Sequence, residues 1–147
     1  GGMELNLFFD IIIASENASF AVPEGLIGAI PPIASTIGVA MVGRRFARYC
    51  LTGEQMDAEE AKQLALVDLV VPPDQLEIVG IEFADKISKL APLSTKAIKS
   101  SMKSVKEVFR NSLEVGMREI MTLIPTEDFA EGMRSFVEKR KPEWRGL

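Results

Sequence analysis

The chain has 147 residues, of which 47% are apolar, and a formal net charge of −4. This length and composition suit one domain with a substantial core, and the acidic balance excludes a general nucleic-acid binder, which needs a basic surface for phosphate. There is no histidine and only one cysteine, so Ser-His triads, intrachain disulfides and the usual zinc sites are excluded, and carboxylate, lysine or tyrosine must carry any proton transfer. No run of about 18 apolar residues occurs and the start lacks a signal-type pattern, so we expect a soluble, cytoplasmic protein without a membrane partner.

The first thirty residues predict mixed and irregular structure. In residues 3–7 apolar and polar side chains alternate, which indicates a half-buried strand, but the glycine pair at residues 1–2 suits the start of a helix equally well. Residues 11–14 are mostly β-branched and predict a buried strand, closed by turn residues at 15–17. Residues 20–30 contain Pro23, Gly25 and Gly28, and we expect them to be irregular.

Helical patterns dominate the rest of the chain. We expect helices at residues 34–51, 57–66, 75–90, 94–123 and 126–139, and a short strand at 67–71. Gly53 is expected to cap the first helix, and Asp57 with Glu60 forms a capping box for the second. The longest helix carries an apolar stripe, expected to be core or subunit interface: Ile98, Met102, Val105, Phe109, Leu113, Met117 and Ile120.

Two glutamates near the start are candidate catalytic residues. Glu4 follows the glycine pair directly, and Glu24 follows Pro23 in the irregular segment. Two carboxyl groups delivered from separate turns into an apolar stretch are what general acid-base chemistry on a carbon skeleton requires. The alternative is that Glu4 is a solvent-facing strand residue and Glu24 an ordinary turn residue.

Several segments, in this order, resemble the enoyl-CoA hydratase/isomerase (crotonase) superfamily. They are Gly1–Leu5 with Asp10 and Ala14, Phe20–Glu24, Leu51–Gly53, Asp57–Ala61, Leu66–Val70, Glu127–Gly132 and Phe136–Pro142. The resemblance covers the whole chain and implies an α/β, crotonase-like fold. It further implies that residues 1–71 are the C-terminal part of the spiral ββα core and residues 72–147 a helical oligomerisation region. The N-terminal half would then be missing or present as a separate chain, and the assembly would be a homotrimer or a dimer of trimers.

The resemblance also implies the chemistry. The substrate would be an acyl-CoA thioester, with coenzyme A as part of the substrate, no separate cofactor and no metal. Glu4 would activate water, Glu24 would deliver a proton to the α-carbon, and the Gly1 amide would donate to the thioester oxyanion. If the chain truly begins at Gly1, that nitrogen is an amine rather than a peptide N–H, and the oxyanion hole is incomplete.

Phe136 and Lys139 match family positions that hold the nucleotide end of coenzyme A. The alternative for the lysine is a solvated helix end that favours the helix dipole.

Three alternatives remain for the activity. Possession of both glutamates favours a hydratase over an enoyl-CoA isomerase. The segment Pro31–Thr36 replaces a glycine-rich family segment and resembles that of cyclic dienoyl-CoA hydratases, which indicates a shifted substrate preference. A truncated, non-catalytic oligomerisation module is the alternative from a different class.

Overall fold

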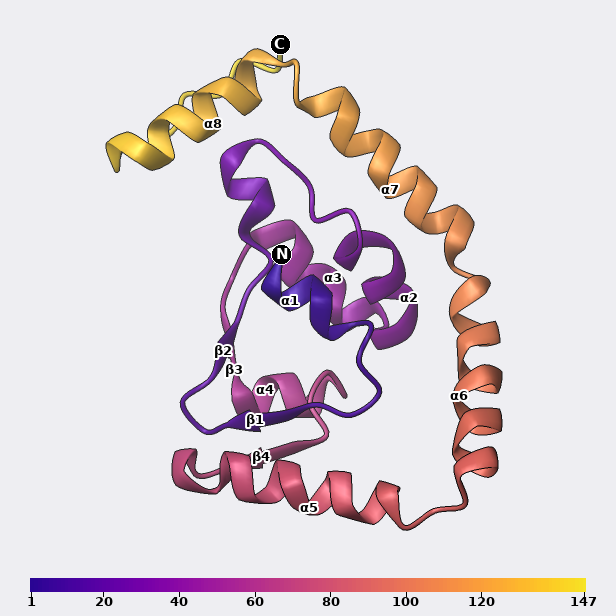
Figure 1. Cartoon of the computed structure of the whole chain (residues 1–147). Helices are drawn as coiled ribbons and strands as arrows, with labels where there is room; N and C mark the ends of the chain where they lie inside the picture. Colours follow the sequence, from indigo (N-terminus) through magenta and orange to yellow (C-terminus); the bar gives the residue numbers. More distant parts are fainter.

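The computed structural model describes the backbone of residues 1–147 and all side chains except those of Val105 and Lys106. Figure 1 shows a central unit of short elements, an arc of long helices around it and a last helix at one end of the arc. The central elements are α1 (Gly2–Asn6), β1 (Ile13–Ser15), β2 (Ser19–Phe20), η1 (Pro23–Ile27), η2 (Ala34–Gly38), α2 (Val39–Val42), α3 (Arg44–Thr52), β3 (Met56–Asp57), α4 (Ala58–Gln63), β4 (Leu69–Val71) and η3 (Pro73–Gln75). The arc consists of α5 (Leu76–Ser88), α6 (Pro92–Glu107) and α7 (Arg110–Leu123), followed by α8 (Glu127–Glu138).

Two short strand pairs join distant parts of the central unit. Strand β1 runs parallel to β4, with Ala14 opposite Val70, and β2 runs antiparallel to β3, with Phe20 opposite Met56. A parallel pair needs a long crossover connection, which here contains η1, η2 and helices α2 to α4. The strands therefore fix the two ends of the segment that carries Glu24 and η2.

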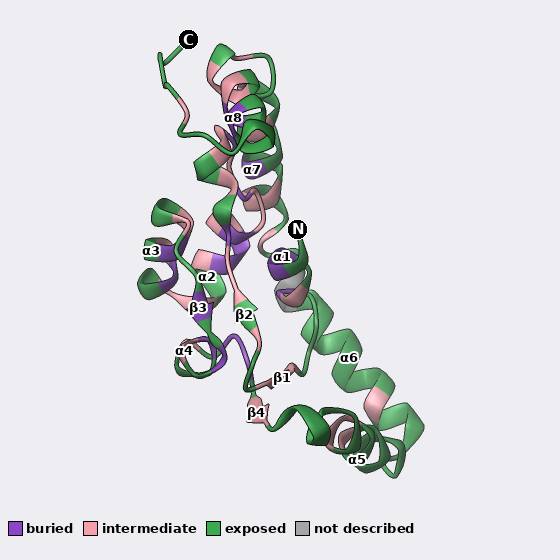
Figure 2. Cartoon of the chain, turned by 90° about the vertical axis from the view of Figure 1, so that its left-hand side faces the viewer, coloured by how far each residue is buried: buried purple, intermediate pink, exposed green. Residues whose placement is uncertain are grey.

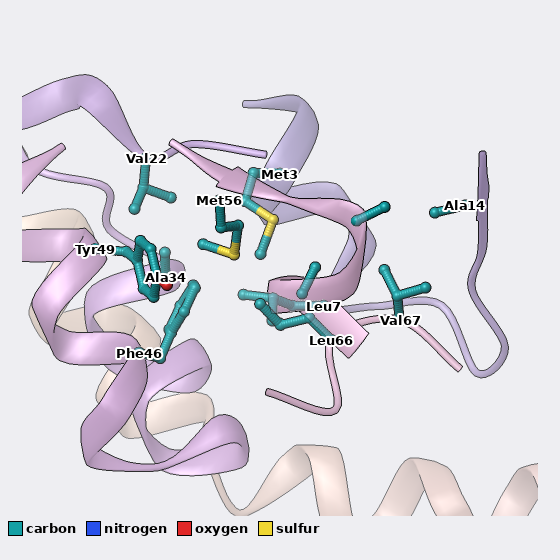
Figure 3. Close-up of a cluster of buried hydrophobic side chains, with 12 residues drawn as sticks. Met3, Leu7, Ala14, Val22, Ala34, Phe46, Tyr49, Met56, Leu66 and Val67 are labelled. Atoms are coloured by element: carbon teal, nitrogen blue, oxygen red, sulfur yellow. The ribbon is translucent and has the colours of Figure 1, made fainter. Parts of the chain in front are cut away.

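The core lies within the central unit. The buried cluster consists of Met3, Leu7, Ala14, Val22, Ala34, Phe46, Tyr49, Met56, Ala58, Ala61, Leu66 and Val67, all between residues 3 and 67. Figure 3 shows side chains of α1, α3 and β3 gathered in one cluster. Figure 2 shows that α5 and α6 are largely exposed by contrast. The first turn of α1 and the segment after η1 are thus anchored to one core.

Several expected elements are confirmed. Asp57 and Glu60 form the expected capping box at the start of α4. Gly53 ends α3 with a left-handed φ of 66°, and its N–H donates to the Tyr49 carbonyl. Thr126 caps α8 by accepting from the Phe129 N–H. Strand β1 at residues 13–15 overlaps the expected strand at 11–14, and β4 at 69–71 lies within the expected strand at 67–71.

Two expectations about elements are wrong, and one open alternative is decided. Residues 2–6 form the helix that the glycine pair allowed and not the strand, with Met3 and Leu7 on its buried side. The expected helix at 34–51 is divided by Gly43, whose φ of 94° leaves the helical region and ends α2. The expected helix at 94–123 is divided at residues 108–109, where a β-branched and an aromatic residue are weak helix formers.

The apolar stripe of the long helix is not the core of this chain. Ile98, Met102 and Met117 are between 39% and 53% exposed, and the side chain of Val105 lies outside the described residues. The interpretation as a subunit interface stays a prediction. Within the described part of the chain, no helix is both long and apolar enough to cross a membrane.

Candidate active site

Glu4 is buried and its carboxylate is held by backbone donors. The residue is only 7% exposed, although glutamate is a polar residue type that is rarely buried, and it lies in the short helix α1. Its Oε1 accepts from the Ile33 N–H at 2.7 Å and from the Ala34 N–H at 2.9 Å. Hydrogen bonds from backbone N–H groups to a carboxylate are among the stronger ones in proteins. Glu4 is therefore not a solvent-facing strand residue.

The two donors come from the start of η2. The first N–H groups of any helix lack partners within the helix, so they are free to bind an acceptor from elsewhere. Two prolines precede them, and the Ser35 and Thr36 hydroxyls donate to the Pro31 and Pro32 carbonyls, each at 2.7 Å. This pattern satisfies the proline carbonyls locally and leaves the two N–H groups for Glu4.

Glu24 lies in the first turn of η1, and its two carboxylate oxygens have different surroundings. Oε1 is 3.3 Å from the Gly1 nitrogen, so the structure brings the expected oxyanion donor and the expected acid together. Oε2 is buried and has no hydrogen-bond partner within the described residues. A buried polar atom without a partner costs free energy, and such atoms in native proteins often mark places where a ligand or a proton is received.

Cys50 shows that both carboxylates act on one region. Burial raises the pKa of the Cys50 thiol to about 11, and the negative charges of Glu24 and Glu4 add to the shift in that order. Cys50 lies on α3 and packs against the core. Both carboxylates, although distant from each other in sequence, thus lie near enough to Cys50 to disfavour its thiolate.

An apolar groove adjoins Glu24. It has a volume of about 370 Å³ and is formed by η1 on one side and by α8 with the following residues on the other, where Met133, Phe136 and Pro142 line it. Phe136 is 71% exposed and therefore available for a ligand in the groove. Lys139, at the end of α8, is exposed and does not line the groove. Of the two expected coenzyme A contacts, only Phe136 shares a groove with a candidate catalytic residue.

Sequence reasoning missed what holds Glu4. It interpreted residues 31–36 only as a sign of a shifted substrate preference, whereas the backbone of Ile33 and Ala34 binds the carboxylate. The available signal was the proline pair itself, because a helix that starts directly after prolines presents free N–H groups in a fixed direction.

The sequence model of the enoyl-CoA hydratase/isomerase family matches residues 1–146. The chain belongs to this family. Among curated relatives, it is 34% identical to 2,3-dehydroadipyl-CoA hydratase of Escherichia coli K12 and 35% identical to carnitinyl-CoA dehydratase of Proteus mirabilis, in each case over 99% of the chain. Among solved structures, carnitinyl-CoA hydratase from Mycobacterium avium superposes with a TM-score of 0.90 at 33% identity over 100% of the chain.

The fold is therefore crotonase-like, with mixed α/β and helical parts, as the sequence resemblance implies. The chain spans 58% and 59% of the length of the two curated relatives and 59% of the solved structure. Activity, substrate and assembly of the whole protein are accordingly matters for proposal.

Proposed function

We propose that this chain supplies both catalytic carboxylates of an enzyme that hydrates α,β-unsaturated acyl-CoA thioesters, or dehydrates the corresponding hydroxyacyl-CoA. The observation that carries the proposal is the contrast between the two glutamates. Glu4 is buried and fixed by two N–H donors, while Glu24 has a buried oxygen without a partner in the described part of the chain. Relatives whose names state hydration or dehydration of CoA thioesters support it.

The residues would share the reaction as follows. Glu4 orients a water molecule and accepts a proton from it as the water oxygen bonds to the β-carbon. Glu24 delivers a proton to the α-carbon, so the elements of water add across the double bond. The Gly1 nitrogen, at the N-terminus of α1 and beside Glu24, supplies one donor to the thioester oxygen when it is part of a peptide bond.

The remaining features follow from the same proposal. The chain corresponds to the C-terminal part of a longer crotonase chain, with residues 1–71 completing the core and residues 72–147 driving formation of a trimer or a dimer of trimers. Phe136, with Lys139, binds the nucleotide end of coenzyme A. A cyclic dienoyl group is one candidate for the acyl group, because the segment Pro31–Thr36 resembles that of cyclic dienoyl-CoA hydratases.

The test uses the complete natural protein that carries this sequence. Crotonyl-CoA, 2,3-dehydroadipyl-CoA and a cyclic dienoyl-CoA are offered, and loss of the enoyl ultraviolet absorbance is followed. We expect Glu4→Gln and Glu24→Gln each to slow the reaction by about 10²- to 10⁴-fold, the usual contribution of a positioned acid or base. Glu54→Gln, which removes an exposed carboxylate paired with Arg48, is the matched control and should leave the rate unchanged.

Full activity of either site variant would contradict the two-carboxylate mechanism. Absence of all activity in the complete protein, with a normal assembly, would favour the non-catalytic oligomerisation module. Migration of the double bond without uptake of water would favour an isomerase.

A further inference from the structure

Helix α7 touches the segment that holds Glu4. Gly116 of α7 is buried, and a Cβ atom at this position would lie 2.3 Å from the Pro32 carbonyl oxygen. No side chain fits at that distance without a shift of backbone. The Pro32 carbonyl therefore packs directly against the backbone of α7 at Gly116. The two elements α7 and η2 are in contact.

Pro32 stands directly before the two donors of Glu4. Its carbonyl also accepts from the Thr36 hydroxyl at 2.7 Å, so the residue is held from both sides. The Pro32 carbonyl and the Ile33 N–H belong to one planar peptide unit, so a shift of the carbonyl moves this N–H directly and displaces the neighbouring Ala34 N–H with it. Displacement of α7 would thus displace the donors that orient the Glu4 carboxylate.

Helix α8 makes the corresponding contact with the Glu24 turn. A Cβ atom at Gly132 would lie 2.3 Å from the carbonyl carbon and oxygen of Ile27, the last residue of η1. The turn is closed by the Ala29 N–H, which donates to the Glu24 carbonyl at 3.0 Å. A shift at Ile27 is consequently passed back to Glu24.

We infer that Gly116 and Gly132 are positioning residues: by permitting backbone contact of α7 with Pro32 and of α8 with Ile27, they hold Glu4 and Glu24 in the geometry of the reaction. The inference rests on the proposed function, which assigns the chemistry to those two carboxylates. The helical half of the chain is then part of the catalytic apparatus, because it sets the position of groups on the other half.

The test compares glycine-to-alanine changes in three helices of the complete natural protein. Gly116→Ala and Gly132→Ala are the probes. Gly80→Ala in α5 is the matched control, because a Cβ atom there meets nothing within 4 Å. We expect each probe to lower kcat by about 100-fold with little change in KM, since a displacement of about 1 Å can cost that much, and Gly80→Ala to leave kcat unchanged.

Double variants distinguish positioning from a general loss of structure. If Gly116 acts through Glu4, then Gly116→Ala causes no further loss of kcat in the Glu4→Gln background, and Gly132→Ala none in the Glu24→Gln background. A change that merely lowers the folded fraction would reduce kcat by the same factor in the unchanged protein and in the protein that carries the glutamate substitution. That multiplicative result, or probes that behave like Gly80→Ala, would overturn the inference.

A measurement independent of activity separates this inference from the proposed function. Hydrogen exchange of the Ile33 and Ala34 amides should be faster in Gly116→Ala than in Gly80→Ala or the unchanged protein. Equal exchange in all three overturns the positioning role, whether or not the protein is a hydratase. If Gly116→Ala does not fold, Pro32→Gly loosens the same segment without added bulk, and it should show the same faster exchange and the same kcat loss that disappears with Glu4→Gln.

Discussion

At the scale of single residues, Cys50 reports on the charge of the site. Its pKa is raised from 9.0 to about 11, because burial and the nearby Glu24 and Glu4 carboxylates disfavour the thiolate. Since the thiolate is the reactive form, alkylation by iodoacetamide at pH 8 should be about 100-fold slower in the folded protein than in urea. Glu24→Gln should accelerate the reaction of the folded protein, and Glu54→Gln should not. Equal rates in the folded and unfolded states would contradict the raised pKa.

The two glutamates could be selected from sequence, but their surroundings could not. Glycine and proline next to Glu4 and Glu24 indicate special backbone, and the family resemblance assigns the roles. The proline pair signals free N–H groups at Ile33 and Ala34, but the sequence does not show that Glu4 binds them, because only the fold decides which acceptor reaches a free N–H group. The contacts of Gly116 and Gly132 could not be predicted for the same reason, since a glycine in a helix does not indicate which segment packs against it.

At the scale of elements, the segment after α8 folds back on that helix. Arg140 binds both carboxylate oxygens of Glu131, and the Glu143 N–H donates to Glu131 at 3.0 Å. Asp128 accepts from the Arg145 and Gly146 N–H groups at 2.7 and 2.9 Å. These bonds hold the wall of the groove that faces Glu24, because Arg140 and Pro142 both line it.

The segment after α8 should be released from the helix at acid pH. Hydrogen bonds from Arg140 and then Glu143 lower the pKa of Glu131 to about 2 from 4.5. A lowered pKa in the folded state means that the stabilisation is present above about pH 4.5 and is lost as the pH falls towards 2. Trp144 is the only tryptophan and lies in this segment, so its fluorescence should change between pH 4.5 and 2.

The Glu131→Gln variant should show the acid-like emission of Trp144 already at pH 7, whereas Glu54→Gln should keep the titration of the unchanged protein. Far-ultraviolet circular dichroism recorded in parallel distinguishes release of the segment from acid unfolding of the helices. An emission that stays constant down to pH 2 would show that Glu131 does not hold the segment.

The elements that sequence identified best are those whose ends have local signals. The capping box at Asp57, the left-handed Gly53 and the Thr126 cap mark helix ends through contacts within a few residues. Helix breaks at Gly43 and at residues 108–109 were missed, because a glycine or a weak helix former interrupts a helix only where packing elsewhere favours the change of direction.

At the scale of the whole molecule, the core lies in the first half of the chain, whereas most of the exposed large apolar side chains lie in the second half. The buried cluster is confined to residues 3–67, whereas α5, α6 and α7 expose large apolar side chains, among them Ile81, Leu93, Ile98 and Met121 at 53% to 82%. Contiguous exposed apolar surface commonly marks a site of contact with another protein. The expectation that residues 72–147 form an oligomerisation region stays a prediction, and this surface is the physical reason for it.

Sedimentation of the complete natural protein tests that prediction with two variants on α6. Ile98→Glu places a charge in the exposed apolar face, and we expect it to shift the protein from trimer or hexamer towards monomer at micromolar concentration, because an unpaired charge in an apolar contact is costly. Ser100→Glu, about 200° around the same helix, adds the same charge away from Ile98 and should leave the assembly unchanged. Since Ile98 is 53% exposed within the chain, the monomer should keep its helical circular dichroism. Identical sedimentation of all three proteins would exclude this face of α6 from the subunit interface.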